Sequence, residues 1–298
     1  MTMGKSAAIC MVRDAVDTVR FLCGHYLRIG VDLIHFVDDG SSDGTYELLQ
    51  GIGARTGKVA VTRSLSRQDR QPERMSEAAN SCIANGYRLV IPFDSDEFWN
   101  LRASDVAELA ALGEPAVVRG DWVNFVQSRE RHYPAPFGLY AMIHRAVPGV
   151  DVRESVIAYR EPFISLSETK VAFWSDQPVR LVRGQHDLTE GGGRVLAGRF
   201  EILHAPLRWK SELTKRALNY EPRLDQDRPA TNAWQSRFHR EALDAGRLDE
   251  VWAANSVDRD GSLDVYGDRR RLARDNRFRN LLIKAAWLMY SRYRIKCF

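Results

Sequence analysis

Short apolar runs alternate with helical segments over the first hundred residues, and this alternation constrains the fold more than any other feature. The apolar runs cover residues 7–12, 33–37, 58–62 and 88–93. Between them, apolar residues recur at helical spacing, and Asp14 is placed to cap the first helix. Strands that alternate with helices form a parallel sheet covered on both faces. The sequence therefore predicts an α/β fold with a mostly parallel central sheet flanked by helices.

Polar residues follow three of these predicted strands. They are Arg13-Asp14, the segment 38–45 and the segment 94–97. In parallel sheets, ligands bind beyond the carboxyl ends of the strands. We therefore expect the three segments to line one cleft.

The segment Asp94-Ser95-Asp96-Glu97 carries the clearest chemistry. Two aspartates one residue apart can share one divalent cation, one of them directly and the other through water. Mg²⁺ or Mn²⁺ suits such oxygen ligands together with diphosphate oxygens. A solvated acidic turn, with Glu97 capping a helix, is the alternative.

The segment 38–45 is rich in Asp, Ser and Gly. Its side chains can bond a base or a ribose, and its glycines permit a tight turn. A calcium-binding helix-loop-helix is excluded, because its closing glutamate would fall at Gln50 and a predicted strand precedes the loop. A strand-to-helix turn capped by Ser42 or Asp43 is the simpler alternative.

Composition sets wide limits. The chain has 298 residues and a net charge of +4, which does not demand a nucleic-acid partner. The four cysteines form no CxxC pair, so a zinc site or a redox pair lacks support. We expect reduced thiols, a cytoplasmic location, and neither a signal peptide nor a membrane-spanning segment.

Four segments occur in an order and spacing that resemble a known family. They are Met11-Val12-Arg13-Asp14, the segment 25–32 with His25-Tyr26-Leu27 and Gly30-Val31-Asp32, the segment 37–45, and Asp94-Ser95-Asp96-Glu97-Phe98. They resemble family 2 glycosyltransferases of the GT-A fold, closest to the bacterial subgroup with MVRNE, DNGSTDGT and DADEF motifs. The likeness is strong over residues 6–100. It departs at Asp14-Ala15, and at Asp38, which precedes Asp39-Gly40.

The resemblance implies a nucleotide-sugar-dependent transferase. Asp38 or Asp39 would meet the base, expected to be uracil, and Asp94 and Asp96 would bind Mn²⁺ or Mg²⁺ and the ribose-diphosphate. The residues implied to bind the nucleotide are Arg13, Asp14, Asp38, Asp39, Ser41, Asp94, Ser95 and Lys215.

A weaker resemblance continues beyond residue 165, where Lys170 also fits the family pattern. It implies that His204 or His186 completes the metal shell and that Arg208 or Lys215 balances the leaving diphosphate. The alternatives are a histidine that bonds locally and a solvated helix face.

The implied reaction moves a sugar, with a UDP-linked donor expected, to a hydroxyl of a glycan or glycolipid in bacterial surface polysaccharide synthesis. A carboxylate should take the acceptor's proton. We assign Asp187 to this role, with Glu190, Glu168 and Glu154 as rivals. Family analogy favours inversion at the anomeric carbon.

Two other functions remain open. A catalytically degenerate relative could act as a scaffold or binding protein. A phosphotransferase with an aspartate nucleophile in the 94–96 segment is disfavoured, because Phe98 stands where such enzymes usually carry Thr or Val, and their motif follows the first strand.

The second half of the chain is harder to interpret. Residues 116–118 and 122–126 predict strands. We expect a GT-A domain over 1–215, with a nucleotide-binding half to residue 100 and an acceptor half from 101, and a helical extension over 216–298. Residues 268–298 mix arginines with apolar residues. That pattern predicts a basic amphipathic helix, either lying on the inner face of a membrane or packed on its own domain.

Overall fold

The computed structural model describes residues 4–64, 70–130, 137–149, 152–218 and 234–297. The chain forms two compact units, each built from separate segments. The first unit comprises residues 1–122, 168–204 and 280–298, and the second comprises residues 123–167 and 205–279. Within the predicted extension 216–298, residues 219–233 and 298 lie outside the described residues. The predicted domain boundaries stay predictions.

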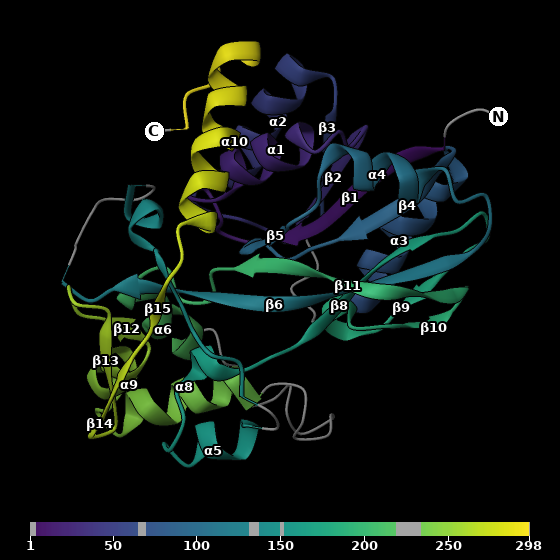
Figure 1. The fold of residues 1–298 in the computed structure, drawn as a ribbon. Helices are drawn as coiled ribbons and strands as arrows, with labels where there is room; N and C mark the ends of the chain where they lie inside the picture. The colour runs from purple at the N-terminus through teal and green to yellow at the C-terminus, as the bar shows by residue number, and fades with distance from the viewer. Residues whose placement is uncertain (1–3, 65–69, 131–136, 150–151, 219–233, 298) are drawn as a thin grey trace. The chain divides into compact units, whose positions relative to one another are not determined.

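The strands predicted in the first hundred residues form a parallel sheet in the first unit (Figure 1). They are β1 (Lys5–Val12), β2 (Leu33–Asp38), β3 (Val59–Arg63) and β4 (Tyr87–Pro92), in the order β3-β2-β1-β4. The helices that connect them are α1 (Val19–Arg28), α2 (Thr45–Thr56) and α3 (Gln71–Ala84). The predicted α/β fold class, with a mostly parallel central sheet flanked by helices, is confirmed.

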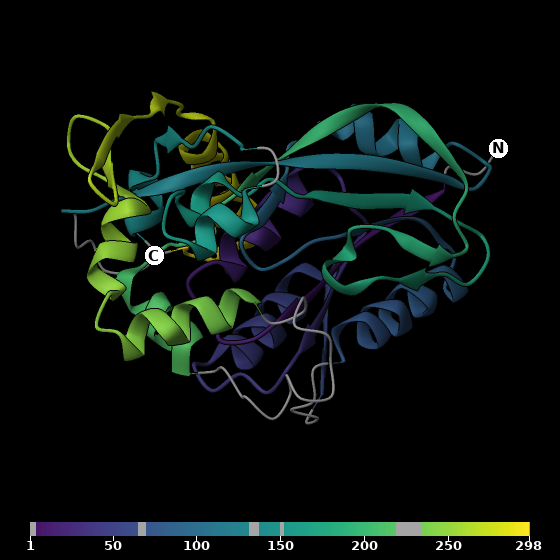
Figure 2. The ribbon, with the colours of Figure 1, turned by 90° about the horizontal axis from the view of Figure 1, so that it is seen from below.

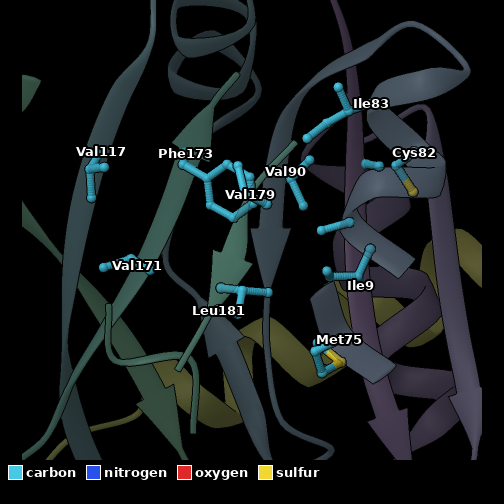
Figure 3. Close-up of a cluster of buried hydrophobic side chains, with 12 residues drawn as sticks. Ile9, Met75, Cys82, Ile83, Val90, Val117, Val171, Phe173, Val179 and Leu181 are labelled. Atoms are coloured by element: carbon cyan, nitrogen blue, oxygen red, sulfur yellow. The ribbon is translucent and has the colours of Figure 1, made fainter. Parts of the chain in front are cut away.

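Both faces of the parallel strands are covered, so these strands are apolar throughout instead of alternating. On β1, Ile9 belongs to the cluster that packs on α3, while the neighbouring Ala8, whose side chain points the other way, is equally buried. Figure 3 shows Ile9 and Val90 from the strands beside Met75 and Cys82 from α3. This packing fixes the positions of the strand ends, where the polar segments begin.

Antiparallel strands extend the sheet beyond β4. β8 pairs with β4 and β6, and β11 pairs with β5. The elements of this part are β5 (Glu97–Trp99), α4 (Ala103–Ala110), β6 (Ala116–Ser128), β8 (Thr169–Trp174), β9 (Arg180–Leu181), the 3-10 turn η3 (Arg183–Gln185), β10 (Leu188–Glu190) and β11 (Arg194–His204). The hairpin of β9 and β10 lies beside α3 (Figure 2).

The strands predicted at 116–118 and 122–126 are one continuous strand, β6. Gly120 lies between them and keeps its pairing with Lys170 on β8. A Cβ at Gly120 would come within 2.7 Å of the Trp99 ring, so the strand passes this ring only because the residue has no side chain.

The second unit has its own core, which includes Leu213, Phe238 and Val251. Its elements are η1 (Phe137–Ala141), β7 (His144–Arg145), α5 (Arg153–Ile157), η2 (Phe163–Ser165), α6 (Lys210–Leu218), α8 (Trp234–Asp244), α9 (Leu248–Ala254), β12 (Ser256–Val257), β13 (Ser262–Val265), β14 (Asp268–Arg271) and β15 (Ala273–Arg274). The predicted helical C-terminal segment is present, but β13 and β14 form a hairpin within it. Tyr266 and Gly267 close this hairpin, both with positive φ.

The last helix, α10 (Arg277–Tyr293), packs on α1 within the first unit (Figure 1). Gly24 of α1 makes the approach possible. A Cβ at Gly24 would lie 2.5 Å from the carbonyl oxygen of Ala285 and 2.8 Å from Cγ of Met289. In the described part of the chain, no helix combines the length and the hydropathy needed to cross a membrane.

This close approach predicts opposite effects for two helix glycines. Gly24→Ala is expected to lower the free energy of unfolding by about 1–3 kcal/mol, because the new methyl group overlaps α10. Gly51→Ala on α2 is the matched control. It meets nothing within 4 Å and should raise stability by about 0.5–1 kcal/mol. Urea unfolding of both variants measures the difference, and a neutral or stabilising Gly24→Ala would contradict the contact.

Candidate active site at the carboxyl edge of the sheet

The three polar segments predicted to share a cleft follow β1, β2 and β4, which are neighbours in the parallel sheet. Their carboxyl ends therefore lie along one edge of the first unit. Backbone hydrogen bonds connect the ends of these strands. The amide of Asp39 donates to the carbonyl of Val12 (2.8 Å), and the amide of Phe93 donates to the carbonyl of Ile9 (3.0 Å). The sheet thus brings the predicted nucleotide and metal residues of the first hundred positions to the same edge.

The loop after β1 is tied to the loop after β2 through Asp14. Its carboxylate accepts hydrogen bonds from the amide of Ser42 (2.8 Å) and from the Ser42 hydroxyl (3.2 Å). Its own amide donates to the Ser41 hydroxyl (3.0 Å). The prediction that Asp14 caps the first helix is wrong, because this carboxylate is engaged here and α1 begins at Val19 after Thr18. Asp14 has a φ of 49°, a strained value that is often kept at functional sites.

Asp38 and Asp39 have different surroundings. The Asp38 side chain is fully buried, accepts the amide of Ser41 (3.2 Å), and pairs with the guanidinium of Arg63 (3.3 Å). Asp39 is half-buried. Asp38 therefore stabilises the loop after β2 from a buried position, whereas the side chain of Asp39 is partly exposed at the carboxyl end of the strand. Arg13 is exposed beside them.

The acidic turn after β4 folds onto itself. The amide of Asp94 donates to Oε2 of Glu97 (2.9 Å), and the amide of Glu97 donates to the carbonyl of Asp94 (3.0 Å). The indole of Trp122 donates to Oε1 of Glu97 (2.7 Å). Glu97 is fully buried, whereas Asp94, Ser95 and Asp96 are partly exposed. Glu97 therefore fixes the conformation of the turn, and Asp94 and Asp96 are partly exposed on it.

Lys170 of β8 supplies a buried cation to this turn. Its ammonium lies 2.5 Å from Oδ2 of Asp94 and 3.2 Å from Oε1 of Glu97. It also donates to Oε1 of Gln185 (3.3 Å). Burial alone would lower the pKa of Lys170, but the carboxylates of Asp94 and Glu97 outweigh burial and raise that pKa above its ordinary value. Lys170 is therefore charged, and it neutralises much of the acidic turn.

The pKa of Glu97 is also raised, but for Glu97 burial is the larger influence. Burial raises the pKa of Glu97 to about 7, while the ammonium of Lys170 works to lower it. Three donors, from Lys170, Trp122 and the Asp94 amide, point at its two oxygens. Since all three donate, Glu97 serves as an acceptor, and the ionised form fits the site.

Asp96 lies on the other side of the turn, next to His204 at the end of β11. Nε2 of His204 is 3.6 Å from Oδ2 of Asp96, and the imidazole stacks on Trp122 with ring centroids 4.0 Å apart. A carboxylate and an imidazole are thus adjacent, as the predicted metal site requires. Among the described residues, however, no group of three or more His, Cys, Asp or Glu side chains could hold a metal ion.

Two glutamines complete the site and were missed at the sequence level. Gln185 of η3 is fully buried in a left-handed conformation (φ 55°), and its Nε2 has no hydrogen-bond partner among the described residues. Gln71, at the start of α3, accepts the amide of Gly184 (3.2 Å) and points its Nε2 at Asp94 (3.4 Å). A strained residue with an orphaned buried donor is a mark of a binding site, but neither glutamine lies in a recognisable motif.

Asp187 and His186 lie in the turn after η3. Arg119 of β6 donates to Asp187 (3.1 Å). Burial would raise the pKa of Asp187, but the amide of Leu188 and the guanidinium of Arg119 prevail and lower it. Nδ1 of His186 lies 2.7 Å from the carbonyl of Thr169. His186 therefore makes the local hydrogen bond that was the alternative to a role as metal ligand.

The remaining predicted residues are distributed over both units. The rival bases Glu168 and Glu190 are exposed in the first unit, whereas Glu154 lies on α5 in the second. Lys215 is exposed on α6 of the second unit, and Arg208, beside this helix, pairs with Glu212 (2.5 Å).

A cavity of about 560 Å³ opens between β2, β3 and α3. Arg63, the partner of Asp38, is on its wall. The cavity is lined by His35, Val37, Thr62, Arg63, Ser64, Arg74, Glu77, Ala78 and Ser81. None of the acidic-turn residues lines it.

The four cysteines are free and buried, as the absence of a CxxC pair suggested. Burial raises the pKa of Cys82 to about 11, so this thiol stays protonated at neutral pH.

No protein-family model and no curated protein matches the chain. Among solved structures, the mannosyltransferase PcManGT from Pyrobaculum calidifontis, solved with GDP-Man and Mn²⁺, is 14% identical with a TM-score of 0.40, over 98% of this chain and 89% of that one. Residues 1–349 of S. aureus TarS are 11% identical with a TM-score of 0.37, over 84% and 90%. GalNAc-T7, solved with UDP, GalNAc and Mn²⁺, is 17% identical with a TM-score of 0.30, over 41% of this chain and 24% of that one. These likenesses are remote, so the functional argument rests on the residues of this chain.

Proposed function

We propose that the chain is a metal-dependent glycosyltransferase of the GT-A fold. It would move a sugar from a nucleoside-diphosphate sugar to a hydroxyl of a glycan or glycolipid. One observation carries the proposal: the turn with Asp94 and Asp96, the loop with Asp39, and the loop with Asp14 follow adjacent parallel strands and lie along one edge. A nucleotide that binds along this edge would place its base near one loop and its diphosphate near the acidic turn.

The residues of the acidic turn fit a divalent cation that arrives with the diphosphate. Asp96 and His204 offer adjacent oxygen and nitrogen donors, whereas the charge of Asp94 is balanced by Lys170. Mg²⁺ typically binds through one or two carboxylates and substrate phosphates, without a cage of protein ligands. This fits the lack of a three-residue cluster among the described positions. When bound, Mn²⁺ or Mg²⁺ would neutralise charge on the departing diphosphate. We assign Asp96 and His204 as its ligands, with Asp94 beside them.

For the nucleotide, we assign Asp39 to the base, because the carboxylate of Asp38 is buried and already satisfied. Arg13, exposed at the same edge, would contact the nucleotide, and Asp14 and Ser41 would hold the pocket in shape. Ser95 would reach the ribose-diphosphate. A UDP-linked donor remains our preferred substrate, on the motif resemblance.

For proton transfer, Asp187 remains our assignment. Arg119 keeps it ionised and therefore ready to accept a proton, but the lowered pKa also makes it a weaker base. Attack by the acceptor oxygen opposite the leaving diphosphate would invert the anomeric centre. Lys215 is proposed to balance the charge of the leaving diphosphate, on the family resemblance.

Donor binding tests this proposal in a thermal-shift screen of UDP-, GDP- and dTDP-sugars, each with and without Mn²⁺. At a concentration of about 100 times Kd, a donor should stabilise the protein by about 2.7 kcal/mol and raise Tm by about 5 °C. The shift should need Mn²⁺ and favour one nucleotide.

A turnover measurement distinguishes an active transferase from a catalytically degenerate scaffold. Release of nucleoside diphosphate from the donor with Mn²⁺ supports an enzyme. A Mn²⁺-dependent shift without any release would support the degenerate scaffold, and the absence of any shift would overturn the nucleotide site.

A further inference from the structure

Helix α10 has two apolar faces, and the first unit uses only one of them. The inner face is buried in the unit and consists of Leu281, Leu282, Ala285, Ala286 and Met289. The outer face carries Ile283, Trp287 and Tyr290, which are 51%, 68% and 49% exposed. Their spacing of i, i+4 and i+7 places them in one stripe. Since a surface helix needs one apolar face to join its own core, the second stripe is unexplained by folding.

The charges around this stripe all have one sign. Residues 277–298 contain Arg277, Arg279, Lys284, Arg292, Arg294 and Lys296, and neither Asp nor Glu. Lys284, Arg292, Arg294 and Lys296 are exposed, and in the described residues no carboxylate lies within ion-pair distance of any of these four. In contrast, Arg277 at the start of the helix pairs with Asp275 (2.7 Å). The cations that flank the stripe are therefore not used to hold the fold.

The cations and the aromatic rings are close to one another. The guanidinium of Arg294 lies 6.0 Å from the centre of the Tyr290 ring. Arg55 of α2 donates to the carbonyl of Arg294 (3.1 Å), which adds a further cation beside the end of α10. The outer surface thus combines exposed Trp and Tyr with a cluster of positive charge.

We propose that this outer surface of α10 docks on an anionic lipid bilayer, with the helix lying in the plane of the interface. Trp and Tyr are enriched at the boundary between headgroups and acyl chains, and the Lys and Arg side chains can bury their stems while their charges meet lipid phosphates. Each cation near an anionic bilayer strengthens binding about fivefold. A helix with an apolar stripe flanked by cations binds in the plane of the interface.

Two other occupants suit the surface less well. A second copy of the chain docked face to face would set one group of unpaired cations against the same group, which costs free energy. A nucleic acid would satisfy the cations but not the aliphatic Ile283. A bilayer with anionic headgroups satisfies both the apolar stripe and the charges.

The inference goes beyond the proposed function and does not depend on it. The outer surface belongs to the first unit, which also carries the acidic turn. Docking would therefore hold the unit that carries the acidic turn at a bilayer surface, where the hydroxyl of a membrane-embedded acceptor would be concentrated.

Vesicle sedimentation tests the proposal with the full chain. Vesicles of phosphatidylcholine containing one third phosphatidylglycerol should bind the protein at least about tenfold more tightly than phosphatidylcholine alone, and added salt should weaken the binding. Trp287→Ser with Tyr290→Ser should reduce binding at least about tenfold. Replacing the four cations by glutamine should reduce it further and remove the salt dependence.

Two matched controls remove an exposed apolar residue and an exposed cation that lie outside α10. Val195→Ser removes an apolar side chain that is 59% exposed in the first unit, and Arg259→Gln removes an exposed cation from the second. Both should bind vesicles like the wild type, and melting curves should show that every variant is folded. Equal binding to neutral and anionic vesicles, or wild-type binding by the α10 variants, would overturn the proposal. So would a lipid-free dimer in sedimentation velocity that Trp287→Ser dissociates, because that result would assign the surface to a second copy.

Discussion

Asp96→Asn is expected to lower turnover by about a hundred- to a thousandfold while leaving the fold intact. The Asp96 carboxylate faces His204 across 3.6 Å. An amide keeps the shape of the side chain but loses the negative charge that a divalent cation requires. Loss of one preorganised group that stabilises developing charge costs about this factor in other enzymes. The donor's Mn²⁺-dependent thermal shift should disappear together with activity.

Asp176→Asn is the matched control for this substitution. Asp176 is exposed in the bend after β8, so the same change of carboxylate to amide should leave both turnover and Tm unchanged. The comparison is made with single-turnover release of nucleoside diphosphate at saturating donor. Asp96→Asn with wild-type turnover would place the metal on other residues.

The sequence predicted the parallel half of the sheet well because the signals there are local. Each strand is a short apolar run bounded by polar residues, and β1 and β2 match the predicted runs to within two residues at each end. The acidic turn could be predicted for the same reason, since a run that ends in Asp94-Ser95-Asp96 needs no distant partner to be recognised. The prediction that the three polar segments lie together came from a topological rule and not from any single residue.

The other half of the site depends on pairings between distant residues. Lys170 is 76 residues from Asp94 along the chain, and β8 reaches the turn only by antiparallel pairing with β4. Trp122 lies on a strand interrupted in sequence by Gly120, and it bonds Glu97 across 25 residues. No local pattern encodes such contacts, because nothing in the sequence specifies which antiparallel neighbour a strand will choose. The alternative of a solvated turn with Glu97 as a helix cap does not hold for this residue, because Glu97 is buried and accepts hydrogen bonds.

The same reasoning explains α10. Its amphipathic pattern was visible, but two interpretations were open: packing on its own domain and contact with a membrane. The structure shows that the inner face packs within the unit, at Gly24 of α1, and leaves a second apolar face exposed. A sequence pattern cannot separate two apolar faces until the partner of one is known.

Lys170→Met is expected to reduce the free energy of unfolding by about 3–5 kcal/mol, the largest stability effect we expect for a single substitution here. The ammonium is fully buried and contacts both Asp94 (2.5 Å) and Glu97 (3.2 Å). Methionine fills a similar volume but leaves the Glu97 carboxylate buried without its cation. Removing one partner of a buried ion pair is costly for this reason, whatever the net value of the pair.

Two further variants isolate the charge from the packing. Lys210→Met removes the cation of an exposed pair with Asp249 (2.7 Å) and should cost at most about 1 kcal/mol, because water screens that pair. Glu97→Gln added to Lys170→Met should recover much of the loss, since the double variant no longer buries an unpaired charge. Urea unfolding followed by tryptophan fluorescence measures all three. If the double variant were less stable than Lys170→Met alone, the Lys170 side chain would act through packing and its other hydrogen bonds, because an unpaired Glu97 carboxylate would not be the source of the loss.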